Sequence, residues 1–115
     1  MTPQEIMDGL ANKNRLLTAK NEEYKELVEK YALAKQAYNI SVATKILTLK
    51  SEGQSITLIP KLVAGDEWVS KLCYQMDVAE GVMNACRESI KDIREAIGTY
   101  RSILTWQRAE LTGQD

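Results

Sequence analysis

Histidine is absent from the 115 residues, and cysteine occurs only twice. Without histidine the chain lacks the commonest general base, the usual partner of a serine or cysteine nucleophile, and a ligand of most zinc and iron sites. No group of residues in the sequence forms a catalytic or metal-binding motif. We therefore expect a protein that is not an enzyme, with no catalytic residues, no metal and no cofactor.

The two cysteines are too far apart to pair with each other. Cys73 and Cys86 lie thirteen residues apart on one predicted helix, which is ~20 Å at 1.5 Å per residue, whereas a disulfide needs α-carbons within ~7 Å. The sequence also has no signal-peptide pattern and no apolar run long enough to span a bilayer. These features predict a location in a reducing cytoplasm and no membrane partner.

Proline is scarce, and neither sign of charge is in excess. Pro3 and Pro60 are the only prolines, so the chain has few places to turn, which favours a small number of long helices. With 44% hydrophobic and 27% charged residues the chain is expected to fold. A net charge of -1 excludes bulk attraction to nucleic acid. Any such binding must come from a local patch.

The strongest pattern present is an apolar seam in the C-terminal half. Apolar residues fall there at alternating steps of three and four, which keeps one stripe of a helix facing a partner helix. The seam consists of Val69, Leu72, Met76, Ala79, Met83, Cys86, Ile90, Ile93, Ile97, Tyr100 and Leu104. It predicts a helix over about 66–111 that begins at Asp66, with a frayed tail from Thr112 to Asp115 and with Gly81 and Gly98 as the places for a bend.

A second seam predicts a helix over about 3–52. Thr2, Pro3 and Glu5 provide a capping box at its start, and Gly53 is a natural C-cap. The seam consists of Leu10, Leu17, Tyr24, Tyr31 and Tyr38 at intervals of seven, with Ile6, Leu27, Val28, Ala34, Val42, Ile46 and Leu49 three or four residues away. It is interrupted by Lys13, Asn14, Lys20 and Asn21, so residues 11–23 are expected to pack loosely or against something else.

The middle of the chain predicts a short helix over about 57–64. Thr57 is its expected cap, and Pro60 lies in its first turn, where a missing N–H costs nothing. The apolar residues here, expected to plug the end of the bundle, are Ile56, Leu58, Ile59, Leu62 and Val63. Two long helices with a compact connection must fold back antiparallel. The predicted fold is all-α, a coiled-coil-like hairpin of long helices with a short connecting helix, forming a single domain over 1–115.

A single hairpin has too little interior for both seams together with Trp68, Val82, Ile103 and Trp106. An exposed apolar strip of that extent normally marks an association surface. We therefore predict a homo-oligomer, most simply a dimer that completes a four-helix bundle. Its seam is expected to consist of Val69, Leu72, Met76, Met83, Ile90, Ile93, Ile97 and Leu104.

Arginines recur every seven residues along one flank of the C-terminal seam. If residue 49 lies beside residue 69, Arg87 and Arg94 face the acidic stretch 22–29 and are expected to form ion pairs with it. Arg101 and Arg108 then face basic residues, so this end of the hairpin is locally positive. The simplest interpretation of these arginines is that they form a solvated charged face whose side-chain stems cover the core.

The positive end is also the candidate ligand site. Guanidinium groups bind phosphate and aromatic rings stack on bases, so the expected ligands are a phosphorylated nucleotide or single-stranded nucleic acid. The candidate residues are Arg94, Arg101, Arg108, Lys13, Arg15, Tyr100 and Trp106. In a dimer, an acidic surface of the second copy would cover this patch instead.

The segment LKSEGQSITLIPKLVAGDEWVSKL, which begins at Leu49, is followed by DVAEGVMNACRESIKDIREAIGTYRSILTWQRAEL, which ends at Leu111. Together they resemble small helical proteins encoded by phages and prophages of Gram-positive bacteria. Proteins of that kind are encoded among early genes for recombination, replication or interference with the host. The resemblance implies an accessory protein in the host cell cytoplasm, without assigning an activity.

Three functions are consistent with these patterns. The first is a non-enzymatic oligomeric helical protein that binds a host protein or a phage recombination or replication protein. The second is sequestration of a phosphorylated nucleotide signal between subunits by Arg94, Arg101 and Arg108, as phage antagonists of nucleotide-signalling immunity do. The third is binding of single-stranded nucleic acid by the same patch during recombination or replication.

Overall fold

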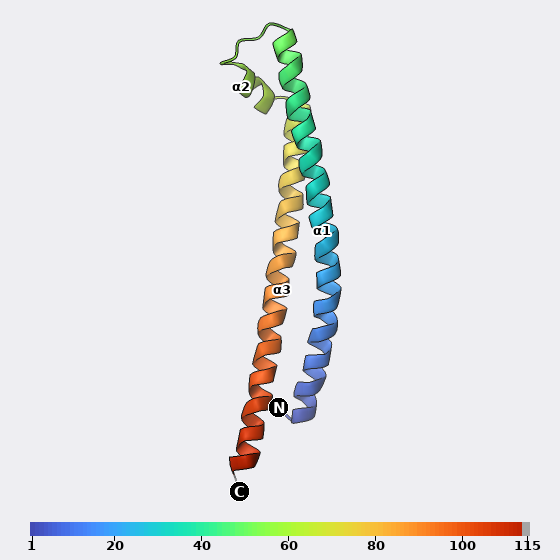
Figure 1. Cartoon of the computed structure of the whole chain (residues 1–115), viewed down its shortest axis with the longest axis vertical. Coiled ribbons are helices and arrows are strands. Elements are labelled where there is room, and N and C mark those ends of the chain that lie inside the picture. Colours follow the sequence, from blue (N-terminus) through green and yellow to red (C-terminus); the bar gives the residue numbers. More distant parts are fainter. Residues whose placement is uncertain (114–115) are drawn as a thin grey trace. The chain divides into compact units, whose positions relative to one another are not determined.

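The computed structural model describes residues 1–113, and within that range the chain forms three helices (Figure 1). Helix α1 spans Pro3–Ser51, α2 spans Ile59–Ala64 and α3 spans Glu67–Gly113. The two long helices pack as an antiparallel hairpin with α2 in the connection, and no strand occurs among the described residues. The predicted all-α helical hairpin is confirmed.

Helix α1 begins at the capping box that the sequence predicts. The Glu5 backbone N–H donates to Thr2 Oγ1 at 3.1 Å, and the Thr2 N–H donates to Glu5 Oε2 at 3.3 Å. Each side chain thus satisfies a backbone donor that the first helical turn leaves free.

Helix α1 is terminated by Gly53, two residues after its last residue Ser51, and Gly53 has a φ of 77°. The N–H groups of Gly53 and Gln54 donate to the carbonyls of Lys50 and Leu49, both at 3.1 Å. This pair of bonds is a Schellman motif, and its left-handed residue is usually glycine because a Cβ is unfavourable there. The predicted C-cap is confirmed.

Helix α3 begins after Asp66, whose Oδ2 accepts the Val69 N–H at 3.0 Å as predicted. The helix runs through Gly81 and Gly98 without a break and includes Thr112 and Gly113. The frayed tail predicted from Thr112 is therefore wrong for these two residues, because the Thr112 hydroxyl donates to the Arg108 carbonyl and α3 continues. Residues 114 and 115 lie outside the described range.

The short helix differs from its prediction at the start. Leu58 precedes α2 without a side-chain cap, and Thr57 does not cap it. The Ser55 carbonyl instead accepts the N–H groups of Leu58 and Ile59, at 3.0 and 3.1 Å. This turn satisfies the Ile59 N–H, which a Thr57 side chain at the N-cap would have bonded.

Only part of the predicted apolar plug is buried. Ile59 and Val63 are buried, whereas Ile56, Leu58 and Leu62 are exposed. A helix of six residues presents one face to the core, and residues four apart share that face. The prediction that all five apolar residues plug the end of the bundle therefore holds for Ile59 and Val63 only.

The contacts divide the chain into two compact units, each containing a segment of α1 and a segment of α3. We call residues 26–84 the connection unit. Its core combines Leu49 of α1, Ile59 and Val63 of α2, and Val69 of α3. Tyr38, Val42 and Ile46 of α1 pack against this core. They are four residues apart and so depart from a strict heptad, because α2 adds a third helix here and α1 buries a wider stripe.

We call residues 1–25 with the part of α3 from Ala85 onward the terminal unit. Its buried apolar residues are Ile6, Cys86, Ile90, Ile93 and Ile97. The predicted register is wrong here by about two and a half helical turns. It placed Arg101 and Arg108 beside residues 13–21, whereas the Tyr100 ring lies against Gly9 and Gln107 Nε2 donates to the Met1 carbonyl at 3.1 Å.

All eleven predicted seam positions of α3 are buried or half-buried. The predicted seam of α1 also faces inward, except for Val28, which is exposed. The residues assigned to an oligomer seam are thus covered in large part within one chain, and their contact with a second copy stays a prediction. Over residues 1–113, neither long helix carries an apolar stretch sufficient to cross a lipid bilayer.

Candidate functional site

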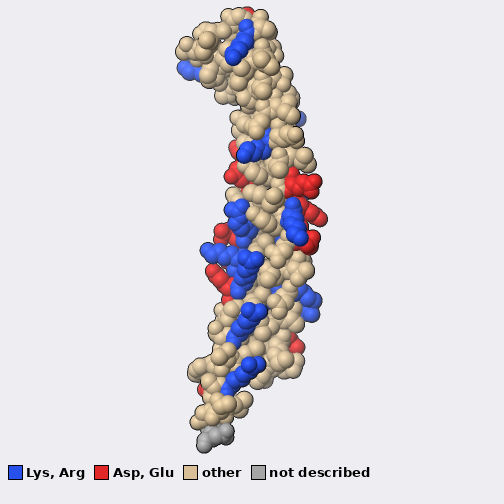
Figure 2. All heavy atoms as spheres, viewed as in Figure 1, with Lys and Arg blue, Asp and Glu red and all other residues tan. Residues whose placement is uncertain are grey.

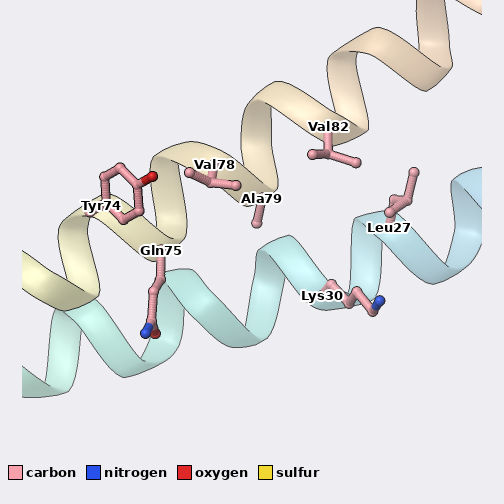
Figure 3. Close-up of a pocket in the computed structure, with 7 residues that line it drawn as sticks. All are labelled: Leu27, Lys30, Tyr74, Gln75, Val78, Ala79 and Val82. Atoms are coloured by element: carbon pink, nitrogen blue, oxygen red, sulfur yellow. The ribbon is translucent and has the colours of Figure 1, made fainter.

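A groove lies between the two long helices of the connection unit (Figure 3). Its volume is about 340 Å³. The lining residues are Leu27 and Lys30 from α1 with Tyr74, Gln75, Val78, Ala79 and Val82 from α3. We call this feature the α1/α3 groove.

The wall of the groove on α3 is apolar and open to solvent. Val78 and Val82 are each 47% exposed, and Tyr74 is 70% exposed. These residues are four apart, so they form a stripe along the helix beside the inner seam. Lys30 is the one charged residue of the lining. Of Tyr74, Val78 and Val82, only Val82 was noted from the sequence. The spacing of four residues along α3 was the signal that could have identified all three.

A second apolar surface lies on the outer side of α1. Leu33, Ile40 and Leu47 repeat every seven residues and are all exposed. With Gln36 and Ala43 between them, which are also exposed, they form what we call the α1 outer stripe. This stripe was not predicted, because the stronger inner seam of the same helix accounted for its helical periodicity.

The predicted ion pairs of Arg87 and Arg94 with the acidic stretch are wrong. Arg87 Nε and Nη2 donate to the Tyr24 hydroxyl at 3.1 and 2.9 Å. The guanidinium carbon also lies 5.8 Å from the centre of the Tyr24 ring, within range of a cation–π interaction. Arg94 has no ion pair within residues 1–113.

Two glutamates of the acidic stretch pair within α1 instead. Lys20 Nζ lies 2.9 Å from Glu23 Oε2, and Lys25 Nζ lies 3.1 Å from Glu22 Oε1. The bond and the charge of Glu23 raise the pKa of Lys20 above its ordinary value. A lysine one turn away on the same helix is closer than an arginine on the neighbouring helix, so the local pairs form.

Three arginines of α3 have neither an ion pair nor a side-chain hydrogen bond within the described range. We call Arg94, Arg101 and Arg108 the basic row, and all three are exposed. Arg101 and the exposed Trp106 line a shallow hollow of about 380 Å³ in the terminal unit. Figure 2 shows Lys and Arg side chains following one another along the terminal unit on the face in view.

The other members of the predicted patch do not join Arg101 and Arg108. Lys13 is half-buried at the seam, and the Arg15 guanidinium donates to the Asn12 side chain. The hydroxyl end of the Tyr100 ring lies against Gly9. The register offset of about two and a half turns is the reason, since it moves residues 13 and 15 away from the end of α3.

The two cysteine thiols are free and lie in different surroundings. Cys86 is buried and donates to the Lys20 carbonyl at 3.7 Å, and Cys73 lies 3.9 Å from an Asp77 carboxylate oxygen. No group of three potential metal ligands occurs over residues 1–113.

Three surfaces therefore bear on function: the α1/α3 groove, the α1 outer stripe and the basic row. No protein-family model, curated protein or solved structure matches this chain. Its function is argued from the chemistry of these surfaces.

Proposed function

We propose that the protein is a non-enzymatic, homo-oligomeric helical protein that binds a partner protein in the α1/α3 groove. The observation that carries this proposal is the apolar wall of Tyr74, Val78 and Val82, which one chain leaves open to solvent. A groove between two helices accepts a third helix whose apolar residues recur every three or four positions. The resemblance to phage accessory proteins favours a host or phage protein in the host cytoplasm as the partner.

The single charge of the groove adds a constraint on the partner. Lys30 is exposed and has no ion pair among residues 1–113. An amphipathic helix that places a carboxylate beside its apolar stripe would satisfy Lys30 and cover the valines in one orientation. Charge complementarity of this kind selects orientation and partner more than it adds affinity.

The test is capture of the partner by tagged protein from the source cells, followed by calorimetry with the purified partner. In the variant Val78→Glu/Val82→Glu, two carboxylates enter the groove, and the affinity is expected to fall at least tenfold because charge must be desolvated there. The control Ser70→Glu/Asn84→Glu adds the same charge to exposed positions of α3 outside the groove. Equal affinity of the two variants, both with unchanged circular dichroism, would reject the groove as the site.

A second candidate function is binding of a phosphorylated nucleotide or single-stranded nucleic acid by the basic row. It is favoured by the three exposed arginines without ion pairs and by the hollow that Arg101 shares with Trp106. Guanidinium groups would bind phosphate, and the indole would stack on a base.

The two ligands of this second candidate are separable by measurement. Affinity for single-stranded nucleic acid would fall steeply with salt, whereas a nucleotide would raise the melting temperature with the logarithm of its concentration. Arg101→Glu/Arg108→Glu should abolish either effect, while Lys61→Glu/Lys71→Glu, the same charge change in the connection unit, should retain it. Binding that survives the first substitution would show that the basic row is not the site.

A further inference from the structure

The α1 outer stripe has the spacing of a coiled-coil seam. From Glu29 to Lys50, residues at alternating steps of four and three all lie on the side of α1 away from its inner seam and are exposed. In order they are Glu29, Leu33, Gln36, Ile40, Ala43, Leu47 and Lys50. Seven positions in this pattern correspond to three heptads, which is enough for knobs-into-holes packing with another helix.

The stripe is more apolar than the surface of an isolated hairpin requires. Leu33, Ile40 and Leu47 are 58%, 56% and 68% exposed, and no charged residue separates them within the stripe. A shallow hollow of about 480 Å³ lies beside Ile40 on the surface of α1, lined partly by the small side chains of Ala32 and Ala43 and by Lys35. A side chain of a facing helix fits such a space between small residues.

The charges at the two ends of the stripe indicate what covers it. Glu29 closes one end and Lys50 the other, and neither has an ion pair within residues 1–113. In an antiparallel pair of identical stripes each Glu29 meets a Lys50, whereas a parallel pair would bring like charges together. The stripe is therefore complementary to itself in one orientation only, as an isologous contact requires.

We propose that the α1 outer stripe is the surface that binds a second copy of this chain, about a twofold axis at Ile40. The two Ile40 side chains meet at the centre. On either side Gln36 lies opposite Ala43 and Leu33 opposite Leu47, with Glu29 and Lys50 paired at each end. This inference rests on the proposed homo-oligomer and identifies its contact surface.

The first test is cross-linking in a Cys73→Ser/Cys86→Ser background. Ile40→Cys places one thiol beside its own copy at the axis, so mild oxidation is expected to convert most of the protein to a disulfide-linked dimer. Lys50→Cys is the control, because its two copies lie ~30 Å apart at 1.5 Å per residue. A mixture of Glu29→Cys and Lys50→Cys chains is expected to form the mixed dimer. Equal cross-linking at positions 40 and 50 would overturn the proposal.

The second test is sedimentation equilibrium, in which the wild type is expected at twice 13.0 kDa. Ile40→Glu is expected to return the 13.0 kDa monomer with unchanged helicity. Glu29→Lys should weaken the dimer by roughly tenfold, and adding Lys50→Glu should restore it, because only reversed pairs then meet. A wild-type dimer that Ile40→Glu leaves intact would refute the stripe but keep the proposed oligomer. A wild-type monomer at every concentration would refute both.

Discussion

Gly9 and Gly98 both lie inside helices of the terminal unit, yet their surroundings are opposite. A Cβ on Gly9 would lie 2.8 Å from Cζ and 3.0 Å from the hydroxyl of Tyr100, whereas a Cβ on Gly98 would have no atom within 4 Å. The missing side chain at residue 9 therefore allows the Tyr100 ring to approach the α1 backbone. At residue 98 the glycine only lowers the helix propensity of α3.

The two alanine variants should consequently change stability in opposite directions. Gly98→Ala is expected to stabilise the protein by about 1 kcal/mol through helix propensity. Gly9→Ala has the same gain but must displace Tyr100, and overpacking of about 1–3 kcal/mol leaves a net loss near 1 kcal/mol. Urea unfolding followed by circular dichroism measures both, and equal stabilisation by the two substitutions would contradict the close packing of Tyr100.

The connection between the long helices contains two isoleucines with opposite surroundings. Ile59 is 6% exposed in the core of the connection unit, while Ile56 in the preceding loop is 83% exposed. The first contributes to the packing of α2 between α1 and α3, and the second does not. Their residue type is the same, so the comparison isolates burial.

Replacing each isoleucine by alanine tests the packing of α2. Ile59→Ala is expected to destabilise the protein by about 2–4 kcal/mol, because it leaves a cavity in the core. Ile56→Ala should change stability by less than about 0.5 kcal/mol. If chemical denaturation gave similar values for the two variants, α2 would not be the plug of the connection unit.

The start of α3 gives a pH-dependent contribution to stability. The Val69 N–H and then the Lys45 ammonium, 3.2 Å from the Asp66 carboxylate, hold the pKa of Asp66 below its ordinary value. A carboxyl group whose pKa is lower in the folded chain stabilises the folded state. Its full contribution is present at pH values above the unfolded pKa of about 3.9. This contribution disappears as the pH falls through the lower, folded pKa.

Asp66→Asn isolates that contribution, since asparagine is also a good N-cap but does not titrate. The wild type is expected to lose more stability than the variant between pH 5 and pH 2, and the two curves should run parallel from about pH 5 to pH 7. Thermal unfolding across this range measures the difference. Parallel curves at every pH would show that the folded chain does not favour the charged form of Asp66.

At the scale of the whole molecule, exposed aliphatic residues gather in the connection unit. Leu33, Ile40 and Leu47 on α1 and Val78 and Val82 on α3 belong to it. The terminal unit carries the basic row instead. The two kinds of surface therefore separate along the chain.

Association at the α1 outer stripe predicts a melting temperature that depends on protein concentration. Wild-type protein should melt at a higher temperature as its concentration rises, because mass action favours the folded dimer. Ile40→Glu should melt at the same temperature at every concentration. Differential scanning calorimetry over a hundredfold range of concentration is the measurement, and a concentration-independent wild type would contradict association.

The hydrogen bonds that cap the helices were predictable because their partners are close in sequence. Thr2 with Glu5, Gly53 with Lys50, and Asp66 with Val69 bond within five residues of one another. The basic row was also recognisable from its spacing, and all three arginines are exposed. The α1/α3 groove and the α1 outer stripe were not recognisable from the sequence. Their exposure depends on which of two apolar stripes the neighbouring helix covers.

The sequence by itself determined the helices, their caps and the inner seams, since periodicity and capping are properties of short segments. Only the tertiary structure decided the register between the helices, and with it the partners of Arg87, Tyr100 and Gln107. A heptad seam repeats along the helix, so more than one alignment brings apolar residues together. Side chains such as the ring of Tyr100 on Gly9 distinguish one alignment from the next, and they do so only in three dimensions.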